Sequence, residues 1–234
     1  MRLNQNVIVM GKVCWLVPYG KNYVEKYHSW MLDENLRCLT ASELLTSREE
    51  YEMQKSWLDD KDKLTFLILN PVSVKKLSDS GAVCACSSVS IVFSLCRSEF
   101  GSQCESNPNS KVSDRPICEW CKLETGCLIG DINLFIDTEN SRGEINMMVA
   151  SEEQRGKGFG KAAYNAFIFY VVKSLKLKEI IAKISESNLA SMAFFTKLGF
   201  KEISRAPVFS EITLSKQLDS LNLEDSNFEI KYMN

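Results

Sequence analysis

The chain has 234 residues, of which 45% are hydrophobic and 25% are charged, and its formal net charge is -2 at pH 7. This length accommodates one large domain or a domain with an insertion. The small net charge gives no overall attraction to nucleic acid or to an anionic membrane, and no stretch reaches the roughly 18 apolar residues that span a bilayer. We therefore expect neither nucleic-acid nor membrane partners.

The cysteines and the amino-terminal sequence bear on the compartment. The chain has nine cysteines, which is an odd count. Its amino-terminal sequence contains no long apolar region and no small-residue cleavage site. Without an export signal, reduced thiols in the cytoplasm are the expected state.

Residues 1–70 alternate between strand and helix patterns. Thr46 precedes Glu49 by three positions in TSREEYEMQKSWLDD, which is the pattern of a capping box at the start of a helix. Apolar residues at near-helical spacing indicate another helix before it. In chain order, the sequence predicts a strand over 12–19, a helix over 22–39, a helix over 46–60 and a strand over 63–70.

The next segment, residues 71–126, is rich in serine and cysteine. Cys118 and Cys121 form a CxxC, but a zinc site needs four ligands. No second CxxC is present, and the one histidine, His28, lies far away in the sequence. We therefore expect no metal, and we interpret the segment as an insertion loop.

Regular structure resumes after this segment. Asn188 is placed to cap a helix and Gly199 to end it. In chain order, the sequence predicts strands over 127–137 and 143–150, a helix to about residue 175, a strand over 178–185, a helix over 188–200 and a strand over 207–218. We interpret the chain as a single domain over 1–217 with the insertion at about 71–126, followed by a polar tail over 218–234 that we expect to be frayed.

A glycine-rich turn, QRGKGFG, separates the strand over 143–150 from the helix that follows it. Backbone N–H groups of such a turn converge on an anion together with the helix N-terminus, and Arg155 and Lys157 add positive charge. Charge-assisted hydrogen bonds of roughly 1.5–3 kcal/mol each would hold a pyrophosphate. The glycine spacing matches neither the GxxxxGK[ST] phosphate loop nor the GxGxxG dinucleotide fingerprint. A connector that binds nothing is the alternative.

The pattern Arg-x-x-Gly-x-Gly at Arg155, Gly158 and Gly160 resembles the acetyl-CoA-binding motif of the GNAT acetyltransferase superfamily. A second feature of that superfamily stands at its usual place, as the strand EIIAKIS, then an asparagine, then SMAFFTKLGF. Segments such as MRLNQNVIVMGKV, YHSWM, EYEMQKSW and KLTFLIL resemble the N-acetyltransferase 9-like branch of the superfamily. The resemblance covers about residues 1–70 and 127–214.

This resemblance implies an α/β fold of the α+β type, with a mixed, twisted sheet, helices on both faces, and two splayed strands that hold acetyl-CoA between them. Unpaired backbone groups near Val149 and Ala150 would then bond the pantetheine arm as an added strand does. The cofactor-binding residues that the resemblance implies are Met148, Val149, Ala150, Arg155, Gly156, Lys157, Gly158, Phe159, Gly160, Asn188 and Phe195.

The reaction needs a base, because the pKa of a free lysine amine is about three units above neutral. Our candidate is Glu144, fourteen positions before Gly158, a spacing that matches the catalytic glutamate of histone-acetylating GNAT members. The alternative is a solvent-exposed carboxylate at a strand end. Asp131 on the preceding strand is a weaker candidate, and His28 is more often a packing residue in such surroundings.

One residue departs from the superfamily pattern. Many members have a tyrosine where this chain has Phe195, and that hydroxyl protonates the leaving thiolate. Two functions therefore stay open: an acetyl-CoA-dependent N-acetyltransferase acting on a protein lysine or α-amine, or a CoA-binding scaffold that acts through protein interaction. Members of the branch are connected with microtubules, so tubulin is a candidate acceptor by resemblance. Acceptor specificity is expected around LTASELL and ISRAPVFSE.

Overall fold

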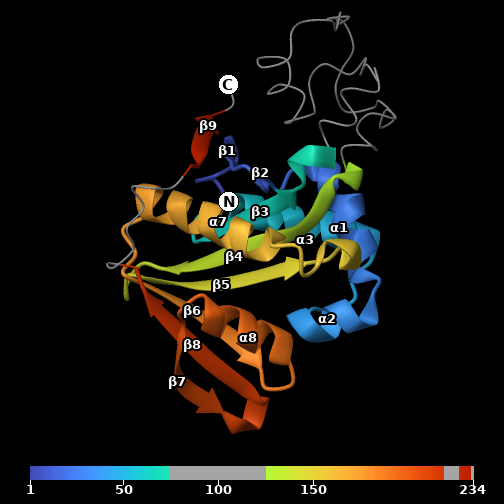
Figure 1. Ribbon diagram of the computed structural model, residues 1–234. Helices are drawn as coiled ribbons and strands as arrows, with labels where there is room; N and C mark the ends of the chain where they lie inside the picture. Colours follow the sequence, from blue (N-terminus) through green and yellow to red (C-terminus); the bar gives the residue numbers. More distant parts are fainter. Residues whose placement is uncertain (74–124, 219–226, 233–234) are drawn as a thin grey trace, which may run out of the picture.

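A computed structural model describes residues 1–73, 125–218 and 227–232, arranged as Figure 1 shows. They form one nine-stranded sheet in the order β7-β8-β6-β5-β4-β3-β2-β1-β9. Its strands are β1 (Val7–Met10), β2 (Trp15–Pro18), β3 (Lys63–Leu69), β4 (Leu128–Asp137), β5 (Arg142–Val149), β6 (Glu179–Ser185), β7 (Lys201–Ala206), β8 (Glu211–Gln217) and β9 (Glu229–Tyr232). The α-helices are α1 (Val24–Met31), α2 (Glu34–Thr40), α3 (Ser47–Asp59), α7 (Phe159–Ser174) and α8 (Leu189–Lys197).

The two faces of the sheet carry separate apolar cores. Ile145 and Met147 of β5 belong to the core that includes Phe167 of α7. Met148, which points the other way because side chains alternate along a strand, belongs to the core that includes Tyr27 of α1. Figure 1 shows α7 crossing one face of the sheet. The predicted mixed sheet with helices on both faces is therefore confirmed.

The sheet is mixed because β5 and β6 are parallel, whereas the other pairings among the described strands are antiparallel. The helix α7 makes the crossover between these two strands. Their pairing joins Arg142–Glu144 to Glu179–Ile181 and then stops, although β5 continues to Val149 and β6 to Ser185. The two strands diverge beyond this point, as Figure 1 shows. The predicted splayed pair is confirmed, and we call the space between its diverging ends the β5–β6 gap.

Several local signals in the sequence have the structure they predict. The capping box of Thr46 and Glu49 is present at the start of α3. The Asn188 side chain caps α8, and Gly199 follows that helix with a φ of 88°. These signals act over three or four residues, so the sequence alone is enough to locate them.

Other expectations are corrected. The helix predicted over 22–39 is two helices, because the Asp33 side chain accepts hydrogen bonds from the N–H groups of Asn35 and Leu36 and starts α2 anew. The tail is not frayed throughout, since β9 pairs antiparallel with β1 over four residues. β7 lies between the helix predicted over 188–200 and the strand predicted over 207–218, where no element is predicted from the sequence. None of the described helices is long and apolar enough to cross a membrane.

Candidate active site

The glycine turn joins β5 to α7 and takes its shape from two glycines. Gly156 has a φ of 72° and Gly158 a φ of 88°, values that residues with side chains rarely adopt. A Cβ atom placed on either glycine would meet nothing within 4 Å, so the space beside the turn is open. Gly158 is the N-cap of α7 and gives it no side-chain cap. The turn therefore presents backbone N–H groups and a helix N-terminus to an anion.

Gly160 has a different role. A Cβ atom at this position would lie 3.3 Å from the Phe194 ring of α8 and 3.8 Å from the Val149 side chain. The missing side chain therefore lets the first turn of α7 approach both α8 and the end of β5. This close approach brings the glycine turn to the open end of the β5–β6 gap.

The Arg155 side chain folds back onto the end of β5. Its Nε donates to the Val149 carbonyl at 2.8 Å, and Nη2 donates to the Ala150 carbonyl at 3.3 Å. Nη1 forms an ion pair with Glu152 at 3.3 Å. The expectation that the backbone near Val149 and Ala150 is unpaired is therefore wrong for these two carbonyls. The Arg155 guanidinium group therefore holds the end of β5 to the turn.

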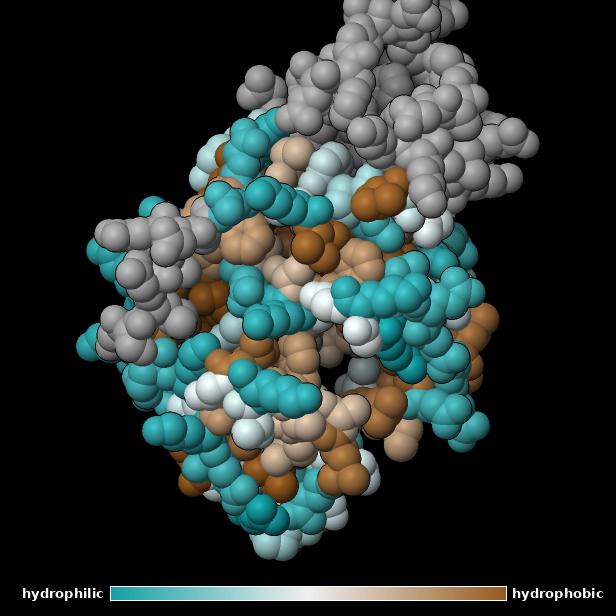
Figure 2. All heavy atoms as spheres, viewed as in Figure 1, coloured by the Kyte–Doolittle hydropathy of each residue, from teal (hydrophilic) through white to brown (hydrophobic). Residues whose placement is uncertain are grey.

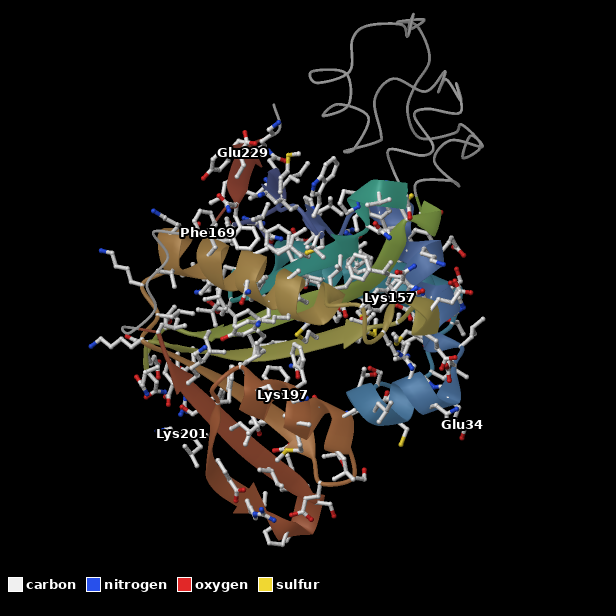
Figure 3. The ribbon with its side chains drawn as sticks, in the orientation of Figure 1. Glu34, Lys157, Phe169, Lys197, Lys201 and Glu229 are labelled. Carbon is white, nitrogen blue, oxygen red and sulfur yellow. The ribbon has the colours of Figure 1, made fainter. Side chains whose placement is uncertain are left out.

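The far side of the gap is held by α8 and α2. The Asn188 Oδ1 accepts a hydrogen bond from the Ser191 N–H at 3.0 Å, and its Nδ2 donates to the Leu39 carbonyl at 3.3 Å. This bond links the start of α8 to α2. Figure 2 shows the surface hollowed between β5, α8 and α2, and Figure 3 places Lys157 at the turn beside it.

Phe195 is buried on α8, with only 3% of its surface exposed. Its ring centroid lies 5.3 Å from that of Phe194 and 5.0 Å from that of Phe200. Phe159 packs against the same apolar core. Aromatic groups therefore pack between α7 and α8.

Glu144 lies at the closed end of the gap, where pairing with β6 stops. Its Oε2 forms an ion pair with Lys183 Nζ at 2.8 Å, and the two side chains are 27% and 42% exposed. The cross-strand neighbour of Glu144 is Phe135, whose ring contacts Lys63 on the helix face that carries α3. The carboxylate is therefore on the face opposite α7, and solvent reaches it.

Asp131 is on the same face of the sheet but lies beneath α1. It accepts hydrogen bonds from Asn133 Nδ2 at 2.6 Å and from the Tyr27 hydroxyl at 3.4 Å. Burial raises the pKa of Asp131 to about 6, and these bonds and Lys63 partly oppose the rise. Its cross-strand partner on β5 is Met148. Asp131 is a buried carboxyl group of the core, whereas Glu144 is accessible.

His28 lies away from the gap, between α1 and α3. Its Nδ1 is 3.8 Å from Glu50 Oε1, and the Glu50 side chain is 1% exposed. Burial raises the pKa of Glu50, and His28 opposes the rise. The structure therefore supports the packing interpretation of His28.

The structure brings the predicted cofactor residues to one end of the gap and the predicted base to the other. Five residues of extended strand, roughly 16 Å, separate Glu144 from Val149. Sequence reasoning missed Lys183 and Tyr27. The signal for Lys183 was one charged residue among the apolar positions of EIIAKIS, but its partner could not be read from the sequence because it lies on another strand.

No cluster of three or more His, Cys, Asp or Glu side chains suited to a metal occurs in residues 1–73, 125–218 and 227–232. The CxxC of Cys118 and Cys121 lies outside the described residues. The expectation of no metal stays a prediction.

Comparison with known proteins agrees with this fold. Residues 97–201 match the family described as acetyltransferase (GNAT) domain. The spermidine N-acetyltransferase of Vibrio cholerae, solved in complex with CoA and spermine, superposes with a TM-score of 0.60 at 14% identity, covering 89% of this chain and 97% of that one. An acetyltransferase (GNAT family) from Bacillus anthracis gives a TM-score of 0.59 at 13% identity, covering 91% and 99%. The chain is a GNAT-fold N-acetyltransferase.

Sequence relatives narrow this class. The N-acetyltransferase 9-like protein of Caenorhabditis briggsae is 36% identical over 221 residues, or 92% of this chain and 87% of the relative. The human protein named alpha/beta-tubulin-N-acetyltransferase 9 is 36% identical over 217 residues, or 92% of this chain and 84% of the relative. The chain belongs to the N-acetyltransferase 9-like family, as the resemblance in its sequence predicts.

Proposed function

We propose that the protein transfers the acetyl group of acetyl-CoA to an amine of a protein acceptor. The observation that carries the proposal is the β5–β6 gap, which opens immediately after Glu144 and ends beside the glycine turn. One end of the gap suits an anion and the other end holds an accessible carboxylate. A donor lying along β5 would therefore reach from the turn to the candidate base.

The residues at the turn fit the pyrophosphate of acetyl-CoA. The left-handed Gly156 and Gly158 leave open space beside them, and the N-terminus of α7 faces that space. Arg155 and Lys157 add positive charge there. The remaining contacts are assigned to Met148, Val149, Ala150, Phe159, Gly160, Asn188 and Phe195. When bound, acetyl-CoA supplies the activated thioester.

Glu144 is proposed as the general base. Its accessible carboxylate lies on the face opposite α7, so an acceptor can approach from one face of the sheet while the donor binds from the other. A positioned base of this kind typically contributes a factor of roughly 10²–10⁴ to the rate. Phe195 has no hydroxyl, so the leaving thiolate receives no proton from that side chain.

The acceptor is proposed to be tubulin. Human and mouse relatives are named alpha/beta-tubulin-N-acetyltransferase 9, at 36% and 37% identity over 92% of this chain. The choice between a lysine and an α-amine stays open. The exposed Val208 and Phe209, which are 91% and 79% exposed, belong to the ISRAPVFSE segment to which we assign acceptor specificity.

Two features favour a second candidate, a CoA-binding scaffold with little catalysis. They are the absence of a hydroxyl at Phe195 and the pairing of Glu144 with Lys183. In this case the gap would bind CoA while the outer surfaces bind a partner. Binding without transfer is the behaviour that separates the scaffold from the enzyme.

The test uses purified α/β-tubulin and acetyl-CoA labelled on its acetyl group. The expected result is labelled tubulin that forms with the wild-type protein and is nearly lost with Glu144→Gln. Mass spectrometry of the labelled peptides identifies the amine. CoA binding by calorimetry, with no label in tubulin or in other proteins of a cell extract, would favour the scaffold.

Two further proposals concern the chain as a whole. We propose that residues 1–217 form a single domain in which about 71–126 is an insertion. The β3 and β4 strands on either side of that segment are paired along most of their length, which supports a continuous core. We also propose a cytoplasmic location, supported by the free thiols of Cys14 and Cys38.

A further inference from the structure

The ion pair of Glu144 and Lys183 crosses from β5 to β6 at the point where the gap opens. The β6 residue paired with Glu144 is Ile181, and Lys183 lies two positions further along β6, on the same face. Its Nζ reaches back to Glu144 Oε2 at 2.8 Å. The proposed base therefore already has an ammonium group as its partner.

Charged groups from the neighbouring strands surround this pair. Arg142 on β5 opposes the charged form of Lys183, whereas Glu211 on β8 supports it. On the other side, Phe135 of β4 separates Glu144 from Lys63 of β3, whose amine lies 3.9 Å from the Phe135 ring. The hydrogen bond to Glu144 is the largest cause of a raised pKa for Lys183. Lys183 is therefore an ammonium throughout the neutral pH range.

An unpaired carboxylate at this position would have an unwanted effect on an amine acceptor. It would form an ion pair with the protonated amine, and so stabilise the form that cannot attack a thioester. A carboxylate that already has a cationic partner gives a second cation much less attraction. The charge on Lys183 thus decides which protonation state of the acceptor the site prefers.

We propose that Lys183 is a specificity-determining residue that neutralises Glu144 and makes the site receive its acceptor as a neutral amine. This inference rests on the proposed function, because it concerns the acceptor of the same site. It adds a discriminating role for a residue on β6, and it explains why the candidate base is ion-paired rather than free. The neutral amine retains its lone pair for the attack, and Glu144 stays beside it.

Kinetics distinguish this role from a merely structural one. The probe is a short peptide from the amino terminus of β-tubulin with one free α-amine, whose pKa is about 7.7–8.0 in water. In the Lys183→Met variant, the unpaired Glu144 should bind the peptide as an ammonium. KM should therefore fall at pH 7 because binding is tighter, and kcat should fall with it because the bound ammonium cannot attack. The acid limb of the kcat profile should move up by about one pH unit, with a loss of roughly tenfold at low pH and little loss at high pH. The acid limb of kcat/KM reports the free reactants and should stay in place.

Three variants serve as controls. Lys183→Arg keeps the charge and should restore the wild-type profile. Glu144→Gln combined with Lys183→Met removes the attracting carboxylate, so the fall in KM should disappear. Lys201→Met removes an equally charged, exposed lysine of β7 and should change neither profile. An unmoved kcat limb in Lys183→Met, or a loss of kcat/KM without a fall in KM, would overturn the inference.

A binding measurement separates failure of the inference from failure of the proposed function. Peptide binding to the CoA-loaded protein is followed at pH 7 by calorimetry in buffers of different ionisation enthalpy, which reports proton release. Wild type should release a proton as the ammonium becomes an amine, and Lys183→Met should not. Proton release without acetyl transfer would support the inference while rejecting the proposed function. Acetyl transfer with equal proton release in both proteins would support the proposed function and overturn the inference.

Discussion

The open end of the β5–β6 gap is formed by the backbone of six consecutive residues, 155–160. The closed end is formed by side chains that lie on separate strands. The turn takes its shape from the φ angles of Gly156 and Gly158 and leads into the N-terminus of α7. The closed end holds Glu144 of β5 and Lys183 of β6, which meet only because the sheet is folded. The proposed donor end is thus defined locally, and the proposed acceptor end depends on strand register.

The largest effect should come from a change at the donor end. Gly158→Asp introduces a side chain at a φ of 88° and a negative charge where the pyrophosphate is expected. Losing even one charge-assisted hydrogen bond costs about 1.5–3 kcal/mol, and repulsion adds to this. We expect the affinity for CoA, measured by calorimetry, to fall by more than about a hundredfold.

Gly158→Ala is the matched control for backbone strain. Its Cβ atom would have open space, so only the left-handed backbone opposes it, at a cost of roughly 1–2 kcal/mol. The alanine variant should therefore retain part of the affinity that the aspartate variant loses. Unchanged CoA affinity in a folded Gly158→Asp protein would remove the donor assignment.

At the acceptor end, Glu144→Gln tests the base. It keeps the size of the side chain but cannot accept a proton, so the transfer rate should drop by roughly 10²–10⁴-fold. CoA affinity should hold, because Glu144 is some 16 Å of extended strand away from the turn. The loss should shrink at high pH, where hydroxide can take the proton that the attacking amine loses. Initial rates between neutral and alkaline pH measure this.

Together these two variants should separate the two ends, since one removes binding and the other removes chemistry. Equal initial rates for wild type and Glu144→Gln at neutral pH would exclude Glu144 as the base. Weakened CoA binding in Glu144→Gln would mean that the two ends are not independent.

The same difference explains what the sequence could predict. The glycine turn, the capping box at Thr46 and the cap at Asn188 are each complete within a few residues, so they could be located directly. The break at Asp33 was hidden because the apolar spacing continues across it. The pairing of β9 with β1 joins residues more than two hundred positions apart, and no local signal encodes it. Lys183 and Tyr27 were missed for the same reason, because their partners lie on other elements.

Beneath α1, Asp131→Asn tests whether that carboxyl belongs to the core. The pKa of Asp131 rises from 3.8 to about 6 on burial, so the folded state binds its proton more tightly than the unfolded chain does. Stability from this group is complete below pH 3.8 and is lost as pH rises through 6. The difference corresponds to about 3 kcal/mol. In the variant, the free energy of unfolding should therefore no longer decline as pH rises through 6. Urea unfolding at several pH values measures this.

Asp137→Asn is the contrasting control on the same strand. Hydrogen bonds from Asn140 lower the pKa of Asp137, so this group stabilises the fold above its unfolded pKa and loses that effect as pH falls. Its replacement should leave the decline up to pH 6 in place. A decline of the same size in Asp131→Asn would show that another group causes it. A large loss of transfer in Asp131→Asn would instead join this residue to the site.

The smallest effect is expected at Phe195, in the aromatic cluster of α8. Phe195→Tyr adds one hydroxyl to a ring that is 3% exposed and packed against Phe194 and Phe200. Without a partner the hydroxyl should cost about 1–2 kcal/mol of unfolding free energy. With CoA bound it gains a partner in the thiolate, so CoA should restore part of this loss and the transfer rate should rise, by up to roughly tenfold.

Phe200→Tyr adds the same hydroxyl to the same cluster, since its ring centroid lies 5.0 Å from that of Phe195. Phe200 precedes β7, whereas Phe195 occupies the α8 position of the superfamily's tyrosine, so the Phe200 variant should lose a similar amount of stability with no recovery on adding CoA. Thermal unfolding of both variants with and without CoA measures the difference. Equal recovery of stability in both variants would mean that CoA stabilises the folded protein in general and not through the added hydroxyl. Recovery in Phe195→Tyr alone, without a faster rate, would place its hydroxyl near the sulfur while showing that thiolate protonation does not limit the reaction.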